Sequence, residues 1–274
     1  MTVPPATASQ RLIVLQKTLY ASRNPTRRYL HCARRDWVRA QIGRLGHQSD
    51  IATALEVGPG SGVYLPDLTN AAQRVIAIDI EPTYLQAAKN LLDAKALEAR
   101  IDCVQGDLRD GPLVDASIDL LLCSEVIEHV ADSASLLDAM AAVLAPGGKL
   151  ILTTPQPYSP VEILGKIAFF PGVVHLLRWI YGEPIEPTGH INLLTRKELE
   201  AQCAGAGLRV LEREVLGFYL PVIGEFAGQT GQKLLATMEQ VLRGTWMEGL
   251  LWTQCYVLER ANQLDAAQDQ LADL

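Results

Sequence analysis

The residues best suited to chemistry lie in "ALEVGPGSGVYL" at positions 54–65, where three glycines alternate with other residues directly after an apolar run. Glycines there let backbone N–H groups approach a ligand closely, as in loops that hold nucleotides or nucleosides. A nucleoside-triphosphate loop needs GxxxxGK[ST], and no lysine follows here. A dinucleotide loop favours GxGxxG, whereas Gly58, Gly60 and Gly62 are spaced as GxGxG. The spacing therefore favours a nucleoside-based cofactor without a pyrophosphate.

Three carboxylates, each at the end of an apolar run, further restrict the class of ligand that the site could bind. Glu56 precedes the glycines, and a carboxylate there repels phosphates but suits an ammonium or sulfonium group. Asp79 ends the next run, seventeen residues past Gly62, where an acid can accept hydrogen bonds from both ribose hydroxyls. Asp107 follows the third run and could accept a hydrogen bond from an exocyclic amine. Together they predict a nucleoside cofactor whose other end is cationic.

Two histidines are candidates for a catalytic base, because imidazole exchanges protons near neutral pH. His190 lies in "TGHINLLT" and His129 lies in "SEVIEHV". Helical spacing would place Glu125, Glu128 and His129 on one face, where they could hold a divalent metal. An oxygen-ligand site would need more carboxylates than this segment offers, so the prediction is no metal. A purely structural role remains the alternative for both histidines.

Short β-branched runs alternate with Ala- and Leu-rich segments from residue 53 onward, which is typical of a parallel sheet covered on both faces. We expect an α/β fold: a seven-stranded, mostly parallel, Rossmann-like sheet that binds its ligand at the carboxyl ends of the strands. The predicted strands are 53–57, 74–79, 100–105, 118–123, 149–154, 208–215 and 250–260.

The outer segments are expected to surround this sheet. Residues 10–47 read as basic amphipathic helices broken near Pro25, and "TRKE" at 195–198 predicts a helix that begins with a capping box. The stretch after the fifth strand is dense in Pro, Gly and aromatic residues, as in a lid over an acceptor. We expect one domain over 1–274, with an N-terminal helical arm (1–50), a cofactor-binding half (51–155), a lid insertion (156–190) and a C-terminal half (191–274).

Charge and composition restrict the partners. The net charge is -7, but residues 1–50 carry nine Lys or Arg against two acids, which leaves fifteen basic against twenty-nine acidic residues afterwards. The arginines of "SRNPTRRYLHCARR" could hold an anionic small molecule, whereas the acidic remainder argues against a nucleic-acid track. The apolar stretch 163–181 is interrupted by charges and a proline, so it predicts membrane-surface contact rather than a transmembrane segment. Five scattered cysteines and no signal-peptide pattern predict a cytoplasmic protein.

The motifs resemble those of class I S-adenosylmethionine-dependent methyltransferases. "LEVGPGSG", "VIAIDIEPTYLQAA", "GDLRDGPLVDASIDLLLCSEVIEHV" and "LAPGGKLILTTP" match in order over about 53–155. "GHINLLTRKELEAQCAGAGL" is similar to the subgroup of small-molecule enzymes that includes ubiquinone-biosynthesis O-methyltransferases, in which the Glu–His segment is associated with magnesium. The resemblance implies S-adenosylmethionine as cofactor, with its methionine part at Glu56, Gly58, Gly60 and Gly62, its ribose at Asp79 beside Ile80, its adenine at Asp107 and Leu108, and its sulfonium near Ser124 and Glu125.

The predicted function is methyl transfer from S-adenosylmethionine to a small organic or lipid-like acceptor, at oxygen ahead of nitrogen or carbon. Two alternatives stay open. One is an RNA or protein methyltransferase that uses the basic arm, against which "CSEV" stands where an NPPY-like tetrapeptide would follow the fourth strand. The other is a non-catalytic protein that binds the cofactor for regulation. The acceptor's identity and the oligomeric state are open as well.

Overall fold

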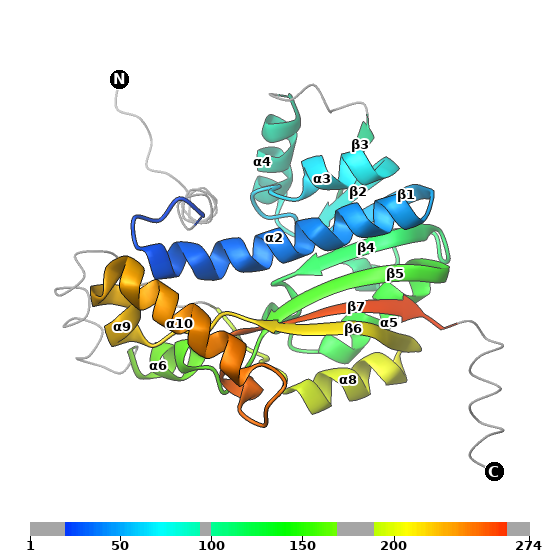
Figure 1. The fold of residues 1–274 in the computed structure, drawn as a ribbon. Helices are drawn as coiled ribbons and strands as arrows, with labels where there is room; N and C mark the ends of the chain where they lie inside the picture. The colour runs from blue at the N-terminus through cyan, green and yellow to red at the C-terminus, as the bar shows by residue number, and fades with distance from the viewer. Residues whose placement is uncertain (1–19, 94–99, 169–188, 262–274) are drawn as a thin grey trace, which may run out of the picture.

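The fold is an α/β sandwich built on a single sheet (Figure 1). The computed structural model describes residues 20–93, 100–168 and 189–261. The described helices and strands are α2 (Pro25–Gln48), β1 (Ile51–Val57), α3 (Leu65–Ala71), β2 (Ala72–Asp79), α4 (Pro82–Asp93), β3 (Ile101–Gln105), β4 (Ile118–Ser124), α5 (Ser133–Val143), β5 (Leu144–Pro155), α6 (Pro160–Ala168), α8 (Arg196–Gly205), β6 (Leu208–Leu216), α9 (Pro221–Phe226), α10 (Gly228–Leu242) and β7 (Thr253–Arg260).

The sheet has seven strands in the order β3-β2-β1-β4-β5-β7-β6. Strands β1 to β5 run parallel to one another, and β7 runs antiparallel to both β5 and β6. All seven predicted strands are present, so the predicted mostly parallel sheet is confirmed. Because β1, the first strand, lies inside the sheet and the order reverses between β1 and β4, the carboxyl ends of these two strands flank the crevice where such folds bind ligands.

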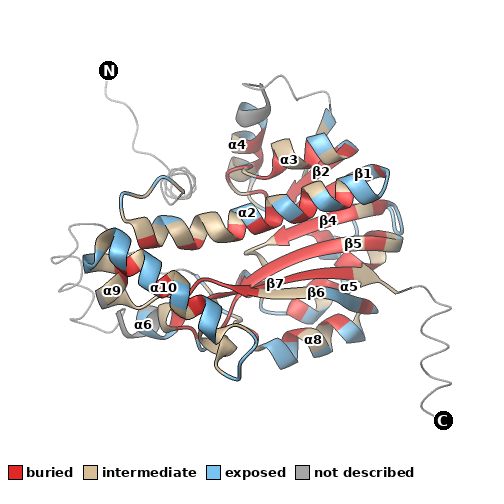
Figure 2. Ribbon diagram, viewed as in Figure 1, coloured by how far each residue is buried: buried red, intermediate tan, exposed pale blue. Residues whose placement is uncertain are grey.

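Helices cover both faces of this sheet (Figure 2). The run Leu120-Leu121-Leu122 shows why the strands read as continuous apolar stretches. Leu120 and Leu122 join the core beneath α2 and α3, while Leu121 joins the opposite core beneath α5 and α8. All three leucines are fully buried, as expected for a strand that is covered on both sides.

Helix α2 begins where the sequence predicted a break. Asn24 caps it by accepting hydrogen bonds from the N–H groups of Thr26 (2.9 Å) and Arg27 (3.0 Å), and Pro25 occupies the first turn. The predicted capping box of α8 is also confirmed, because Thr195 accepts from the Glu198 N–H while the Glu198 side chain accepts from the Thr195 N–H. The part of the predicted arm before residue 20 lies outside the described residues.

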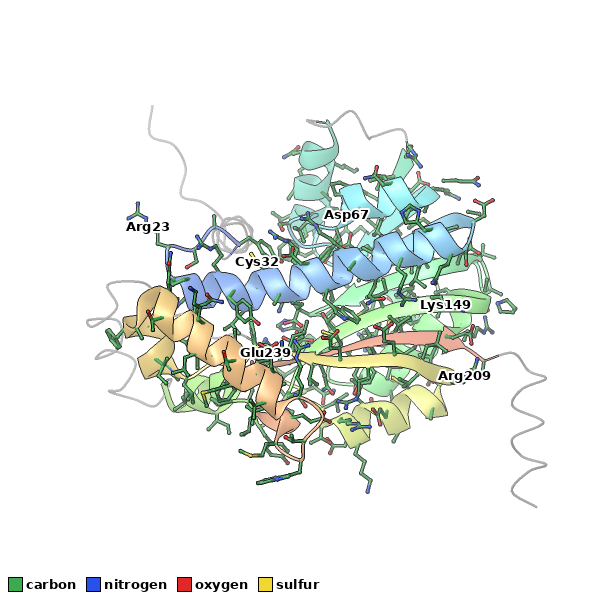
Figure 3. The ribbon with its side chains drawn as sticks, in the orientation of Figure 1. Arg23, Cys32, Asp67, Lys149, Arg209 and Glu239 are labelled. Carbon is green, nitrogen blue, oxygen red and sulfur yellow. The ribbon has the colours of Figure 1, made fainter. Side chains whose placement is uncertain are left out.

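Two helices between β6 and β7 were not predicted. Helices α9 and α10 pack together near the start of α2, and their small core contains Val215, Phe218, Leu235 and Leu251. Glu239 of α10 is fully buried, and it accepts a hydrogen bond from the Tyr29 hydroxyl of α2 (3.0 Å) (Figure 3). These helices cover the end of the molecule toward which β4 and β5 point (Figure 1).

The predicted lid is described only in part. Helix α6 lies within it, whereas Phe169, Phe170, Trp179 and Tyr181 fall outside the described residues. Within the described part of the chain, no helix combines the length and the hydropathy needed to span a membrane.

Candidate active site

The glycine loop between β1 and α3 has the left-handed backbone that its composition suggests. Gly58, Gly60 and Gly62 have φ values of 66°, 51° and 73°, in the region that side chains other than glycine rarely adopt. The Gly58 N–H donates to the Ile78 carbonyl (2.9 Å), which ties the loop to the end of β2. A Cβ at position 58 would lie 2.6 Å from Cγ2 of Val126, so this glycine also permits the close approach of the loop after β4.

Gly58→Ala is expected to destabilise the protein by about 2–4 kcal/mol, because overpacking against Val126 adds to the backbone strain. Gly147→Ala is the matched control, since Gly147 has a φ of 74° and nothing lies within 4 Å of its missing Cβ. Denaturant unfolding should therefore show the smaller loss for the Gly147 variant. Equal losses in the two variants would mean that the contact with Val126 carries no cost.

The two acids of the predicted cofactor site are buried at neighbouring strand ends. Glu56 is 2% exposed, and its Oε2 has no hydrogen-bond partner within the part of the chain that the structure describes. Burial raises the pKa of Glu56 well above its usual value, and the charges of Asp67 and Asp79 raise it further. An unpartnered buried carboxylate oxygen is costly, so it marks a place where a ligand donor belongs.

Asp79 lies at the end of β2 and is 9% exposed. Its Oδ1 accepts a hydrogen bond from the Glu81 N–H (2.9 Å), which orients the carboxyl group at the strand end. Burial raises the pKa of Asp79 to about 6, partly offset by the Glu81 backbone hydrogen bond.

The other residues predicted to contact the ribose and the adenine differ in their exposure and in their hydrogen-bond partners. Ile80 is 70% exposed directly after Asp79, while Leu108 is buried. The Gly106 N–H donates to the Asp79 carbonyl (3.0 Å), so the ends of β2 and β3 lie side by side. Asp107 caps the turn that follows and forms an ion pair with Arg109 (2.6 Å). That ion pair lowers the pKa of Asp107, and its carboxylate is already engaged.

Helix α2 supplies a wall of this site that the sequence analysis did not assign. A cavity beside the glycine loop is lined by Tyr20, His31 and Arg34 together with Glu56, Pro59, Gly60, Ser61, Val63, Tyr64, Ser124 and Glu125. Among the described residues, nothing forms a hydrogen bond with Nδ1 of His31, Nε of Arg34 or the Tyr64 hydroxyl, all of which are buried there. Burial lowers the pKa of His31 to about 3, so its imidazole is neutral.

The arginines clustered at the start of α2 form ion pairs with different partners, and only one of these pairs lies in the cavity wall. Arg34 forms an ion pair with Glu125 in the cavity wall (2.5 Å), whereas Arg27 pairs with Glu225 and Arg35 with Asp36. A signal in the sequence could have singled out Arg34. Its spacing from Leu30 and Val38 puts it on the apolar face of α2, where a charged residue needs a buried partner.

The predicted helical face of Glu125, Glu128 and His129 is wrong. Glu125 has a φ of 58°, and Ile127–His129 form only one short 3₁₀ turn, so the helical spacing does not apply. Glu125 faces Arg34, while Glu128 is fully buried and accepts a hydrogen bond from Thr154 (3.0 Å). Ser124 and Thr153 share a hydrogen bond (2.9 Å) beneath this rim.

The two candidate histidines lie together. Their ring centroids are 5.2 Å apart, although His129 follows β4 and His190 follows the insertion. Nδ1 of His129 donates to the Gly189 carbonyl (3.1 Å), and Nδ1 of His190 lies 3.0 Å from Oε2 of Glu162. Burial lowers the pKa of His129.

These groups do not form a magnesium site. Ligand atoms of Glu128, His129 and His190 all lie within 4.8 Å of one another. One carboxylate and two imidazoles are a poor set for Mg²⁺, which takes oxygen ligands and keeps several waters. Glu125, the other acid of the segment, is paired with Arg34. The magnesium associated with the resembling subgroup therefore does not fit here.

The sheet order, the glycine loop after β1 and the acids at the ends of β1 and β2 define the fold of a class I S-adenosylmethionine-dependent methyltransferase. Residues 55–152 match the model of the methyltransferase domain family. A Mycolicibacterium smegmatis protein named as a probable S-adenosylmethionine-dependent methyltransferase is 29% identical over 211 residues, which cover 76% of this chain and 72% of that protein. Residues 55–152 therefore form a class I S-adenosylmethionine-dependent methyltransferase domain, and S-adenosylmethionine is its cofactor.

Two further relatives show how far the similarity extends. A ubiquinone biosynthesis O-methyltransferase from Xylella fastidiosa is 32% identical over 127 residues, which cover 46% of this chain and 48% of that enzyme. The chain thus matches about half the length of that enzyme. The N-methyltransferase NodS from Bradyrhizobium japonicum, solved with S-adenosylhomocysteine, has a TM-score of 0.56 at 15% identity and covers 93% of this chain and 97% of its own. That likeness concerns the fold alone.

The described residues fit the cofactor. The glycine loop has three left-handed positions without side chains, and the adjoining cavity contains the unpartnered Oε2 of Glu56. The neutral His31, the Tyr64 hydroxyl and the Arg34 guanidinium in the same cavity add donors beside this acid.

Proposed function

We propose that this methyltransferase acts on a small organic or lipid-like acceptor and that the acceptor is methylated at oxygen. The observation that carries the proposal is the pair of histidines in contact, one of which, His129, lies four residues after Glu125 of the cavity wall. An oxygen acceptor such as a phenol loses a proton as it reacts, and a positioned imidazole can take that proton. A nitrogen or carbon acceptor remains the second candidate.

The cofactor roles proposed for the site residues follow from their surroundings. Glu56 would hold the cationic methionine part against the glycines at 58, 60 and 62, and Arg34 would hold the carboxylate of that part. Asp79 would accept from the ribose hydroxyls, with the adenine between the exposed Ile80 and the buried Leu108. Asp107 is proposed at the adenine amine, which requires it to keep an oxygen free beside Arg109.

When bound, S-adenosylmethionine supplies a methyl group already activated by a positively charged sulfur. The chain contributes alignment, exclusion of water and proton transfer. Holding the acceptor oxygen close to the methyl carbon can lower the barrier by roughly 7–11 kcal/mol. His190 is proposed to take the acceptor proton, and His129 is the neighbouring alternative.

Cofactor binding is expected to weaken as the pH falls through about 6. The pKa of Asp79 is raised to about 6, so its carboxyl group gains a proton below that pH and loses an acceptor for the ribose hydroxyls. Calorimetric titration with S-adenosylhomocysteine from pH 5 to 8 measures this, and binding below pH 6 should release protons to the buffer.

The stability of the free enzyme depends on pH in the opposite sense to cofactor affinity. Because the folded pKa of Asp79 exceeds the usual value of 3.8, the folded state binds the proton more tightly, and the contribution of Asp79 to stability falls as the pH rises from about 4 to about 6. Asp79→Asn is the control, since it should reduce both effects while Glu56 remains. A pH-independent affinity in the parent enzyme would contradict the proposal.

Apolar side chains near the site support a lipid-like acceptor and a peripheral membrane contact. Ile163 and Leu164 of α6 are exposed, and so are Phe226, Leu234 and Val241 on α9 and α10. The two acids of this pair of helices, Glu225 and Glu239, are both engaged with arginines. The cytoplasm is the proposed location, because all five cysteines are free thiols.

The basic arm gives less support to an RNA or protein acceptor. Arg27, Arg34, Arg39 and Arg44 of α2 are all paired with carboxylates of the same chain. Those charges are therefore compensated internally and do not form an open basic track, which a nucleic-acid partner would require.

The experiment that tests the proposal is transfer of a labelled methyl group. The enzyme is incubated with methyl-labelled S-adenosylmethionine and, separately, with hydroxylated small molecules, a lipid extract, RNA and a protein mixture. Label in one of the first two fractions, as an ether or ester by mass spectrometry, supports the proposal. Label only in RNA or protein would contradict it, and cofactor binding without transfer to any fraction would favour a regulatory role.

A further inference from the structure

Glu162 of α6 lies between two residues that are distant from it in sequence. It is 5% exposed, and both of its carboxylate oxygens have a partner. Oε1 accepts a hydrogen bond from Nε1 of Trp252 (3.1 Å), and Oε2 lies 3.0 Å from Nδ1 of His190. One buried acid therefore joins the start of the insertion, its end and the segment before β7.

Trp252, the second partner of Glu162, is held in place by contacts of its own. Trp252 is 8% exposed, and its backbone N–H donates to the Gly217 carbonyl (2.6 Å). The Arg34 guanidinium lies 5.5 Å from the centre of its ring, and His31 contacts the ring edge-on with centroids 5.2 Å apart. Trp252 thus connects Glu162 to the wall of α2 that lines the cofactor cavity.

The chemistry of these partners determines the proton positions. The indole N–H of tryptophan only donates, and an ionised carboxylate only accepts. Oε1 is occupied by Trp252, so Nδ1 of His190 must carry a proton to satisfy Oε2. The lone pair of the neutral imidazole then resides on Nε2.

We propose that Glu162 is a positioning residue that holds His190 as the Nδ1–H tautomer and so keeps Nε2 able to accept a proton. This inference rests on the proposed function, in which His190 takes the proton of the acceptor. Trp252 contributes by occupying the second oxygen of Glu162, which prevents the carboxylate from turning away.

Glu162→Gln tests the inference with almost no change in shape. Glutamine has one oxygen and one NH₂ group in place of two oxygens. Trp252 can only donate, so the amide oxygen must turn toward it and the NH₂ group must face His190. Nδ1 then accepts, and His190 is expected to switch to the Nε2–H tautomer, with its proton on the nitrogen that should be free.

Removing the tryptophan donor should reverse this switch. In the double variant Glu162→Gln, Trp252→Phe the amide oxygen is free to face His190, so the Nδ1–H tautomer is expected to return. Trp252→Phe alone keeps Glu162 and should remain Nδ1–H. These variants distinguish an effect of the hydrogen-bond pattern on the tautomer from an effect of lost packing.

The measurement is ¹⁵N NMR of histidine-labelled protein, in which the shifts of the two ring nitrogens distinguish the tautomers, with His190 assigned from the spectrum of His190→Ala. Binding of S-adenosylhomocysteine within about threefold of the parent affinity shows that each variant is folded. The parent, the double variant and Trp252→Phe should all show the Nδ1–H tautomer. Only Glu162→Gln should show the Nε2–H tautomer. An Nε2–H parent, or a Gln variant with the parent tautomer, would overturn the inference.

Turnover supplies an independent readout. Glu162→Gln should lower kcat at least tenfold with little change in cofactor affinity, and the double variant should recover part of that loss. If no acceptor is methylated by the parent enzyme, the proposed function fails while the tautomers still decide the role of Glu162. If the Gln variant does not fold, an Nε2–H tautomer in the parent or in Trp252→Phe alone overturns the inference, and Nδ1–H in both supports it.

Discussion

Asp79→Ala is expected to weaken binding of S-adenosylmethionine by about 10²- to 10⁴-fold. The carboxylate would accept hydrogen bonds from two ribose hydroxyls, and a hydrogen bond to a charged group contributes about 1.5–3 kcal/mol. Two of them amount to about 3–6 kcal/mol, and each 1.4 kcal/mol is a factor of about ten in affinity. Isothermal titration calorimetry with S-adenosylmethionine and with S-adenosylhomocysteine at pH 7.5 measures the loss directly.

The control for this variant is Asp102→Ala. Asp102 lies on the neighbouring strand β3, where its side chain is 54% exposed and paired with Arg74. An exposed ion pair contributes little to stability, and Asp102 is not among the proposed cofactor contacts, so its removal should leave cofactor affinity within about twofold. An Asp79→Ala protein that binds the cofactor as tightly as the parent would refute the ribose role.

His190→Ala is expected to lower kcat by about 10²- to 10⁴-fold, the range that a positioned general base contributes. Cofactor affinity should stay nearly constant, because Nδ1 of His190 contacts Glu162 rather than any residue of the cofactor cavity. Single-turnover rates with the acceptor that the labelling experiment finds measure the effect. A separate calorimetric titration with S-adenosylhomocysteine shows that the cofactor site is intact.

His129→Ala is the matched comparison for this prediction. Its ring lies 5.2 Å from that of His190, but its Nδ1 donates to the Gly189 carbonyl and its side chain is 42% exposed. We expect a smaller loss of turnover in this variant. A large loss for His129→Ala together with normal turnover for His190→Ala would transfer the role of proton acceptor to His129.

Two ion pairs join α2 to the elements around the cavity beside the glycine loop. Arg34 pairs with Glu125 at the end of β4, and Arg39 pairs with Asp67 of α3. The buried polar atoms of His31, Arg34 and Tyr64 that have no partner among residues 20–93, 100–168 and 189–261 all line the cavity that contains Glu56. Helix α2, which lies outside the matched domain of residues 55–152, therefore lines the cavity proposed to bind the cofactor.

Local sequence patterns determined the sheet and the glycine loop. The strands were predictable because parallel strands covered on both faces need unbroken apolar runs, and the helix start at Thr195 was predictable because a capping box is made by residues three apart. The alternating glycines at 58, 60 and 62 likewise act through their own backbone angles. The division of 1–274 into arm, cofactor half, insertion and C-terminal half stays a prediction.

Only the tertiary structure decided which side chains face one another. Arg34 and Glu125 are ninety-one residues apart, Glu162 and Trp252 ninety, and neither partner can be chosen from spacing along one element. The predicted helical face of Glu125, Glu128 and His129 failed for the same reason, because the left-handed Glu125 turns the chain where an ideal helix would have continued. Local patterns fix backbone angles and the buried face of an element, whereas a hydrogen bond between distant segments depends on how whole elements pack.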